Sequence, residues 1–234
     1  MRARGIFVTG TGTEVGKTVV AAAIAHTLAA EGKRVAVFKP CVTGLDEFVA
    51  DGPNCLPIRD KSAHRPDHEV LGLAAGSGQG DEEIAPYRYG SPASPHLAAA
   101  LAGEEIDPPR LRVAAAAAAA GADAIVCEGV GGLLVPLAPG YLVRDLAADL
   151  GYPLVVVASP ELGTINHTLL TLESARAAGL EVASVVLTPW PDRPTEIERS
   201  NRETIAALGE VEVEVLPRLD LSAPSTWPAL SPGR

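Results

Sequence analysis

The chain has 234 residues, of which 47% are hydrophobic and only 4% aromatic, so one large domain or two small ones can form around Ala, Val, Leu and Ile. A net charge of −10 disfavours non-specific binding to nucleic acid or to acidic membranes. Cys41, Cys55 and Cys127 are far apart and form no C-x-x-C pair, which argues against a disulfide framework or a structural zinc site. We expect no signal peptide and no membrane span, because the apolar runs are short. These features predict a cytoplasmic enzyme.

The first predicted elements flank a glycine-rich turn. Residues 5–8 predict a buried strand and residues 19–28 a helix, and between them lies Gly10-Thr11-Gly12-Thr13-Glu14-Val15-Gly16-Lys17-Thr18. A turn of this kind that ends in Gly-Lys-Thr is typical of loops that bind phosphate groups. Glycines let backbone N–H groups surround an oxyanion, and the helix N-terminus adds partial positive charge. Lys17 is then expected to reach the β- and γ-phosphates, and the Thr18 hydroxyl to hold Mg²⁺.

The spacing of this turn departs from the strict phosphate-loop pattern, since Gly10 lies one residue too far from Gly16. A dinucleotide-binding fingerprint is the alternative interpretation. It would require glycine where Val15 stands, and an acidic residue after the second strand, where the chain has Lys39-Pro40. The lengthened phosphate loop is therefore the better interpretation.

Further along the chain, predicted strands alternate with predicted helices. We expect strands at 34–39, 124–127, 154–157, 182–187 and 211–216, and helices at 66–75, 97–103, 109–120, 141–150, 166–178 and 195–208. Residues 45–65 are predicted to be a surface loop, and the Pro- and Ser-rich tail 217–234 to wrap the surface. The strands are short continuous apolar runs, which is typical of a parallel sheet covered on both faces. We therefore predict a single doubly wound α/β domain over residues 1–234, with a mostly parallel sheet like that of the phosphate-loop hydrolases.

In such sheets, ligands bind outside the carboxyl ends of the strands. Lys39 ends the second strand, where it either stabilises a transferring phosphoryl group or is simply an exposed lysine. Glu128 follows the third strand, as a metal ligand or as a solvated acid at a turn. Asn166 opens a helix after Gly163-Thr164, and the residues alone do not decide between a ligand contact and a helix cap.

Five segments together resemble the dethiobiotin synthetase family. They are Val8 to Thr18, Lys39-Pro40, Ser94-Pro95-His96, Glu128-Gly129-Val130-Gly131-Gly132, and Leu162-Gly163-Thr164-Ile165-Asn166-His167. The resemblance covers residues 5 to about 218 in the right order. It implies a cyclo-ligase of biotin synthesis that joins CO₂ to the two amines of 7,8-diaminopelargonic acid. ATP is the co-substrate and Mg²⁺ the metal, and the steps pass through a carbamate and a carbamic-phosphoric anhydride.

The resemblance also assigns residues. It implies that Lys17 and Lys39 are catalytic, and that the metal ligands are Thr18, Asp67 and Glu128, with Asp60 and Asp51 as alternatives to Asp67. Contacts to the nucleotide fall on Thr13, Glu14, Val15, Gly16, Lys17, Thr18, Glu128, Gly129, Val130, Gly131, Thr188, Pro189, Leu216, Pro217 and Arg218. Contacts to the other substrates fall on Thr13, Thr43, Ser94 and Asn166. Asn166 comes from the second subunit, so the active site lies at a homodimer interface.

One departure from the family pattern affects the nucleotide base. Relatives often present an asparagine after the fifth strand, whereas this chain has Thr188 followed by Pro189. A threonine hydroxyl cannot make the paired amide contact that distinguishes adenine. Our hypothesis is therefore a relaxed base selectivity in which other nucleoside triphosphates are accepted.

Two other classes of protein share such a loop. Amide-forming ligases of related fold usually carry a glutaminase domain, for which this chain is too short. Partner-switching ATPases of the partition or septum-positioning type carry an extra lysine early in the loop, where this chain has Gly10, Thr11 and Gly12. They also often use basic or amphipathic surfaces, in contrast to the charge of −10.

Overall fold

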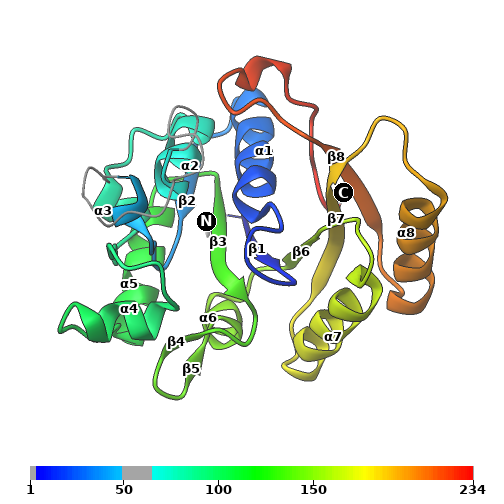
Figure 1. The fold of residues 1–234 in the computed structure, drawn as a ribbon. Helices are drawn as coiled ribbons and strands as arrows, with labels where there is room; N and C mark the ends of the chain where they lie inside the picture. The colour runs from blue at the N-terminus through cyan, green and yellow to red at the C-terminus, as the bar shows by residue number, and fades with distance from the viewer. Residues whose placement is uncertain (1–3, 49–64, 234) are drawn as a thin grey trace, which may run out of the picture.

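The sheet is the centre of the fold. A computed structural model describes residues 4–48 and 65–233. Six parallel strands run in the order β2-β3-β1-β6-β7-β8 (Figure 1). Their bounds are β1 (Arg4–Gly10), β2 (Val35–Phe38), β3 (Ala124–Gly132), β6 (Leu154–Ala158), β7 (Val182–Trp190) and β8 (Val213–Pro217). The predicted doubly wound α/β fold is confirmed.

Helices cover both faces of this sheet, as the apolar strands require. The helices are α1 (Lys17–Ala30), α2 (Asp67–Ala75), α3 (Asp81–Ile84), α4 (Pro95–Leu101), α5 (Pro108–Ala119), α6 (Val143–Leu150), α7 (Thr164–Ala177) and α8 (Glu196–Gly209). The 3-10 turns are η1 (Leu45–Phe48) and η2 (Pro224–Thr226). Within the described part of the chain, every helix is too short or too polar to cross a membrane.

The side-chain alternation of the strands divides the core into two layers. Val8, Val37 and Val126 face α1 and α2, whereas Phe7 and Phe38 face the opposite layer with α5 and α6. A smaller cluster joins α7 and α8 to β7 on that second face. Because successive strand residues point to opposite faces, the residue after Phe38 and the residue after Cys127 both turn toward α1 and α2.

Several boundaries differ from the prediction. Strand β3 continues past Cys127 to Gly132, because its pairing with β1 extends to Gly10 through a local irregularity in register. The helix expected from residue 141 begins at Val143, since the two residues before it form β5 (Tyr141–Leu142), which pairs with β4 (Pro136–Ala138) in an antiparallel hairpin. The Pro139-Gly140 turn between those strands was the signal for this hairpin. Helix α3 was also not predicted.

The tail follows the surface as predicted, since most of its residues are exposed or half-buried, but two apolar side chains anchor it in the core. Trp227 and Leu230 are buried in the core cluster that contains α1. The backbone N–H of Leu230 donates to Thr27 Oγ1 at 3.0 Å, and the ring of Trp227 lies edge-on to that of His26. The composition of the tail, which is rich in Pro and Ser, did not indicate that Trp227 and Leu230 would be buried. Figure 1 shows the red C-terminal segment returning to the blue helix α1.

Candidate active site

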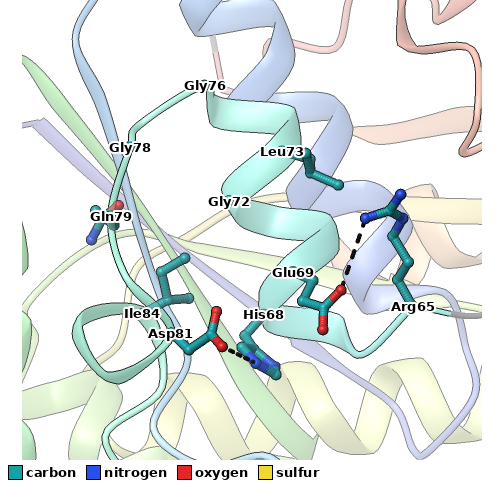
Figure 2. A pocket seen from close by; sticks show the side chains of 10 residues that line it. All are labelled: Arg65, His68, Glu69, Gly72, Leu73, Gly76, Gly78, Gln79, Asp81 and Ile84. Atoms are coloured by element: carbon teal, nitrogen blue, oxygen red, sulfur yellow. Dashed lines mark ion pairs between the residues drawn. The ribbon is translucent and has the colours of Figure 1, made fainter. Parts of the chain in front are cut away.

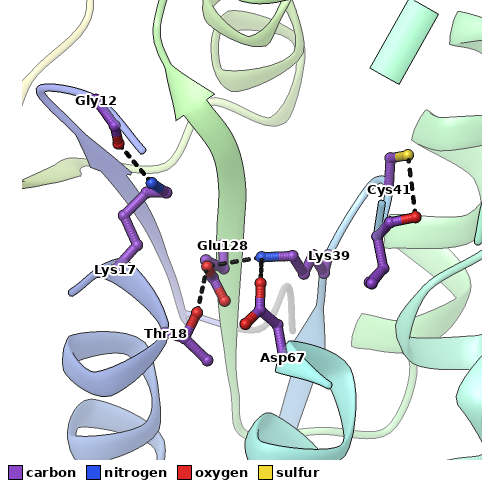
Figure 3. A network of polar contacts seen from close by, with 8 residues as sticks. Gly12, Lys17, Thr18, Lys39, Cys41, Asp67 and Glu128 are labelled. Atoms are coloured by element: carbon purple, nitrogen blue, oxygen red, sulfur yellow. Dashed lines mark hydrogen bonds and ion pairs between the residues drawn. The ribbon is translucent and has the colours of Figure 1, made fainter. Parts of the chain in front are cut away.

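The register of the sheet brings Lys39 and Glu128 together. Phe38 pairs with Cys127 in the parallel strands β2 and β3. Lys39 and Glu128 directly follow these two residues and therefore lie side by side. Both side chains point to the face where α1 begins with Lys17 and Thr18. Helix α2 begins on the same side with Asp67. Figure 3 shows Thr18, Lys39, Asp67 and Glu128 converging, whereas the Lys17 side chain points toward Gly12.

Four of these side chains form one connected polar network. The ammonium group of Lys39 lies 2.7 Å from Glu128 Oε1 and 2.7 Å from Asp67 Oδ2. The Thr18 hydroxyl donates to the same Glu128 Oε1 at 2.9 Å. Lys39 and Glu128 are only 3% and 1% exposed, while the Asp67 side chain is 45% exposed. Asp67 was the favoured of three aspartates, and the alternatives Asp51 and Asp60 lie outside the described residues.

The electrostatics of this network follow from burial and from the single lysine. Burial raises the pKa of Glu128, although the ammonium group of Lys39 opposes the shift. Burial alone would lower the pKa of Lys39, but the charges of Asp67 and Glu128 outweigh it and the pKa is raised. Burial likewise works against the ionised form of Asp67, yet Lys39 and the Thr18 hydroxyl together lower its pKa. The Lys39–Asp67 pair is therefore charged at neutral pH.

The same oxygens fit a divalent cation. Glu128 Oε2 is buried and has no hydrogen-bond partner, so one carboxylate lone pair remains available inside the site. Carboxylate and hydroxyl oxygens are the ligands that Mg²⁺ prefers, usually with only one or two carboxylates. Over residues 4–48 and 65–233 there is no cluster of three His, Cys, Asp or Glu side chains suited to a metal. Thr18, Asp67 and Glu128 would thus leave positions for phosphate oxygens and water.

The phosphate loop is open to an anion. Helix α1 is preceded by Gly16 with φ of 93°, and no side chain caps its first turn. Lys17 folds back over the loop, and its ammonium group donates to the Gly12 carbonyl at 2.7 Å (Figure 3). Burial lowers the pKa of Lys17. The backbone N–H groups and this lysine supply positive charge for a phosphate group.

A contact that the sequence did not reveal links this loop to β7. A Cβ placed on Gly16 would lie 2.6 Å from Thr188 Cγ2, so only glycine fits beneath that methyl group. Thr188 is buried and therefore closes one side of the loop. This contact also shows that the carboxyl end of β7 reaches the phosphate loop.

The other predicted nucleotide contacts differ in exposure. Thr13, Glu14, Pro189 and Arg218 are exposed, whereas Val15, Val130, Gly131 and Pro217 are half-buried. Gly129 is buried between Phe7 and Val143, where an added Cβ would lie 3.1 Å and 3.0 Å from their side chains. The Leu216 side chain belongs to the core. That side chain is therefore not available to a ligand.

The predicted substrate contacts lie outside the four-residue network. Thr43 is half-buried and follows Val42, which bridges to the segment at Arg88. Ser94 occupies the position before α4, and Asn166 is exposed in the first turn of α7. In the described part of the chain, the hydrogen bonds and ion pairs of the network do not extend to these three residues.

A groove of about 480 Å³ lies between α2 and α3 (Figure 2). The lining residues are Arg65, His68, Glu69, Gly72, Leu73, Gly76, Gly78, Gln79, Asp81 and Ile84. Its two ion pairs are long, at 3.8 Å between His68 Nε2 and Asp81 and 3.9 Å between Arg65 and Glu69. None of the predicted site residues lines it. The phosphate loop and its network are therefore the better candidate site.

Comparison with known proteins decides the family. The family described as AAA domain matches residues 4–229. The ATP-dependent dethiobiotin synthetase BioD of Bacillus subtilis strain 168 is 34% identical, with 92% of this chain and 88% of the relative covered. The same enzyme of Anaeromyxobacter dehalogenans strain 2CP-C is 42% identical, with 88% of this chain and 89% of the relative covered. The chain belongs to the dethiobiotin synthetase family.

Solved structures of more distant proteins share the fold. A ParA family ATPase from Chlorobium tepidum superposes with a TM-score of 0.55 at 15% identity, covering 95% of this chain and 87% of its own. The septum site-determining protein MinD of Pyrococcus horikoshii gives 0.51 at 16% identity, covering 92% and 81%. At such identities the likeness extends to the fold alone. Sequence similarity therefore places the chain among dethiobiotin synthetases, and the ParA family ATPase and MinD share its fold.

Proposed function

We propose that the chain is an ATP-dependent dethiobiotin synthetase, a ligase of biotin biosynthesis. It closes the ureido ring across the two amines of 7,8-diaminopelargonic acid with CO₂, and releases ADP and phosphate. The observation that carries this proposal is the convergence of Lys17, Thr18, Lys39, Asp67 and Glu128 at one edge of the sheet. Identity to BioD enzymes over about nine-tenths of the chain supports it.

The chemistry needs an activated carbamate. One amine of the substrate attacks CO₂ and loses a proton, which gives a carbamate whose oxygen is a poor leaving group. That oxygen takes the γ-phosphoryl group of ATP, and ADP leaves. The second amine then attacks the carbonyl carbon, loses a proton and expels phosphate. Because the transferring group carries its charge on oxygen, the protein contributes mainly positioning and electrostatic stabilisation.

Each residue of the site has a role in this sequence. Lys17 exchanges its bond to the Gly12 carbonyl for the β- and γ-phosphates, and the backbone N–H groups of the loop hold the same anion. Lys39 neutralises charge that develops on the transferring group. Thr18, Asp67 and Glu128 would hold Mg²⁺, which shields the phosphate charges and orients them.

The remaining nucleotide contacts are assigned to the surrounding strand ends. Thr13, Glu14, Val15 and Gly16 bind the phosphates with Lys17 and Thr18, and the other nucleotide contacts are Glu128, Gly129, Val130, Gly131, Thr188, Pro189, Leu216, Pro217 and Arg218. Thr188 supports a relaxed selectivity for the base, because its hydroxyl cannot form the paired amide contact with adenine. Competition assays that show a preference for ATP over CTP and GTP greater than about a hundredfold, or 2.7 kcal/mol, would reject this part.

The diamine and its carbamate are assigned to Thr13, Thr43 and Ser94, and the substrate carboxylate to Asn166 of a second subunit. The exposed position of Asn166 on α7, beside a Leu162 that is 90% exposed, supports a homodimer with shared active sites. Within this dimer, we propose that residues 1–234 of each subunit form a single domain. Because ATP and the other substrates are metabolites of the cytoplasm, we place the enzyme there.

The direct test is product formation. ADP and dethiobiotin should appear together, and only when ATP, bicarbonate and the diamine are all present. Lys17→Ala should abolish both, whereas Lys33→Ala, at a surface lysine paired with Glu31, should leave both unchanged. ATP turnover that responds only to DNA, lipid or a protein partner would instead favour a partner-switching ATPase of the partition type.

A further inference from the structure

The C-terminal segment begins beside the phosphate loop. Strand β8 leaves the sheet at Pro217, which is level with Trp190 at the end of β7. Two residues earlier on β7, Thr188 packs against Gly16 of the loop. Residues 217–220 therefore start at the same edge of the sheet as the groups that hold the phosphates. On the proposed function, this segment is part of the wall around the nucleoside.

The segment is then turned back and anchored. Asp220 Oδ1 accepts from the Ser222 N–H at 2.9 Å and from the Ser222 hydroxyl at 2.6 Å, which forms a tight turn. Beyond η2, the indole N–H of Trp227 donates to the Asp220 carbonyl at 2.7 Å. The chain between residues 220 and 227 is thus closed into a loop by one tryptophan. We call residues 217–233 the C-terminal strap.

The anchor of the strap is the phosphate-binding helix itself. Trp227 is only 9% exposed, and its ring lies 5.4 Å from that of His26 with an angle of 69° between the planes. Leu230 is buried next to it, and its N–H donates to Thr27 Oγ1. His26 and Thr27 belong to α1, whose first residue is Lys17. One rigid helix therefore fixes both the phosphate loop and the strap.

We propose that Trp227 is a positioning residue for the nucleotide: it holds residues 217–220 at a fixed distance from the phosphate loop, so that these four residues bind the nucleoside. This inference rests on the proposed function, which places a nucleoside triphosphate in that loop. It also explains how a chain with Thr188 at the base position binds a nucleotide: backbone groups of an anchored strap contact the nucleoside whatever its base.

The test separates nucleoside binding from phosphate binding. Calorimetry would measure the affinity of the full chain for ATP and for tripolyphosphate, each with Mg²⁺. Trp227→Phe keeps most of the ring but loses the N–H that bonds to Asp220. We expect its Kd for ATP to rise about three- to tenfold while the Kd for tripolyphosphate stays unchanged. At saturating ATP, kcat should equal that of the parent, because the lost contact acts equally on ground and transition states.

Two further variants serve as controls. Ser225→Ala changes an exposed position of η2 and should leave both affinities unchanged. Should Trp227→Phe not fold, Ser222→Ala loosens the same turn and should weaken ATP binding about twofold. Unchanged ATP affinity in the folded variant, or equal weakening of ATP and tripolyphosphate, would overturn the proposal. A parent enzyme that binds neither ligand would instead overturn the proposed function, so the two failures are distinguishable.

Discussion

The ammonium group of Lys39 lies 2.7 Å from Glu128 Oε1 and 2.7 Å from Asp67 Oδ2. The ammonium group therefore stands between two carboxylates that are also the expected ligands of Mg²⁺. A lysine in this place neutralises two acids that would otherwise repel each other in a buried site. These two contacts leave the third N–H of the ammonium group for a transferring phosphoryl group. A divalent cation on the carboxylates would compete with the charge of Lys39.

Replacing Lys39 tests this relationship. Lys39→Met should lower kcat for dethiobiotin at least about a hundredfold, because it removes the charge that we propose stabilises phosphoryl transfer. The same variant should bind Mn²⁺ without nucleotide more tightly than the parent does, since no ammonium group competes for the carboxylates. Steady-state assays and Mn²⁺ titration followed by electron paramagnetic resonance measure the two effects.

Lys39→Arg keeps the charge and should show no gain in Mn²⁺ affinity. Unchanged kcat and unchanged Mn²⁺ binding in Lys39→Met would contradict this prediction.

Much of the site was predictable because it depends on local pattern and parallel register. The loop ending in Lys17-Thr18 is a contiguous motif. Lys39 and Glu128 each follow a continuous apolar run, and parallel strands place such residues at one edge. The choice of Asp67 as the expected metal ligand came from the family resemblance, because Asp67 reaches the site through the start of α2. No periodicity in the sequence specifies that placement.

Other features depend on contacts between distant residues and left little trace in the sequence. The strap is held by Trp227 on His26, two residues about 200 positions apart. A composition rich in Pro and Ser is typical of exposed segments. It therefore gave no sign that Trp227 is buried. The contact of Thr188 with Gly16 is of the same kind, because it joins the first loop to the fifth strand of the parallel sheet.

Gly16 should tolerate no side chain, for two separate reasons. Its φ of 93° is unfavourable for other residues, and an added Cβ would lie 2.6 Å from Thr188 Cγ2. Gly16→Ala should weaken ATP binding at least about tenfold, since strain of about 1–3 kcal/mol falls on the loop itself. Calorimetry with ATP measures this loss.

Gly32 is the matched control for that variant. It ends the turn after α1 with φ of 81°, but an added Cβ there would meet nothing within 4 Å. Gly32→Ala should therefore lower the free energy of unfolding by about 1 kcal/mol without changing ATP affinity. Combining Gly16→Ala with Thr188→Ser removes the methyl group and should restore part of the lost affinity. Equal ATP binding by Gly16→Ala and the parent would show that the loop does not hold the phosphates.

The buried thiols should be unreactive in the folded protein. Cys41 and Cys127 are free and fully buried. Burial raises the pKa of Cys41 to about 12, so at pH 8 this group is a protonated thiol, and burial also raises the pKa of Cys127. The thiolate is the reactive form. In a Cys55→Ser background, Ellman's reagent at pH 8 should therefore label neither residue of the native protein and both after unfolding in guanidinium chloride. Labelling of the native variant at the rate of a free thiol would contradict the burial.

The proposal that two subunits share each active site makes a quantitative prediction about mixed dimers. Lys17→Ala removes the phosphate-binding lysine, and Asn166→Ala removes the residue expected to come from the partner subunit, so each variant alone should lose most of its activity. In a mixed dimer, one site contains Lys17 from one subunit and Asn166 from the other, and is intact. Random exchange gives mixed dimers for half of the population, each with one intact site of two, so activity should recover to about a quarter of the parent's.

The assay follows dethiobiotin formation after co-expression of the two chains. Pairing Lys17→Ala with a chain that carries both substitutions provides no intact site and should restore nothing. If mixed dimers form and the first combination also stays inactive, Asn166 acts within its own subunit or plays no part in binding.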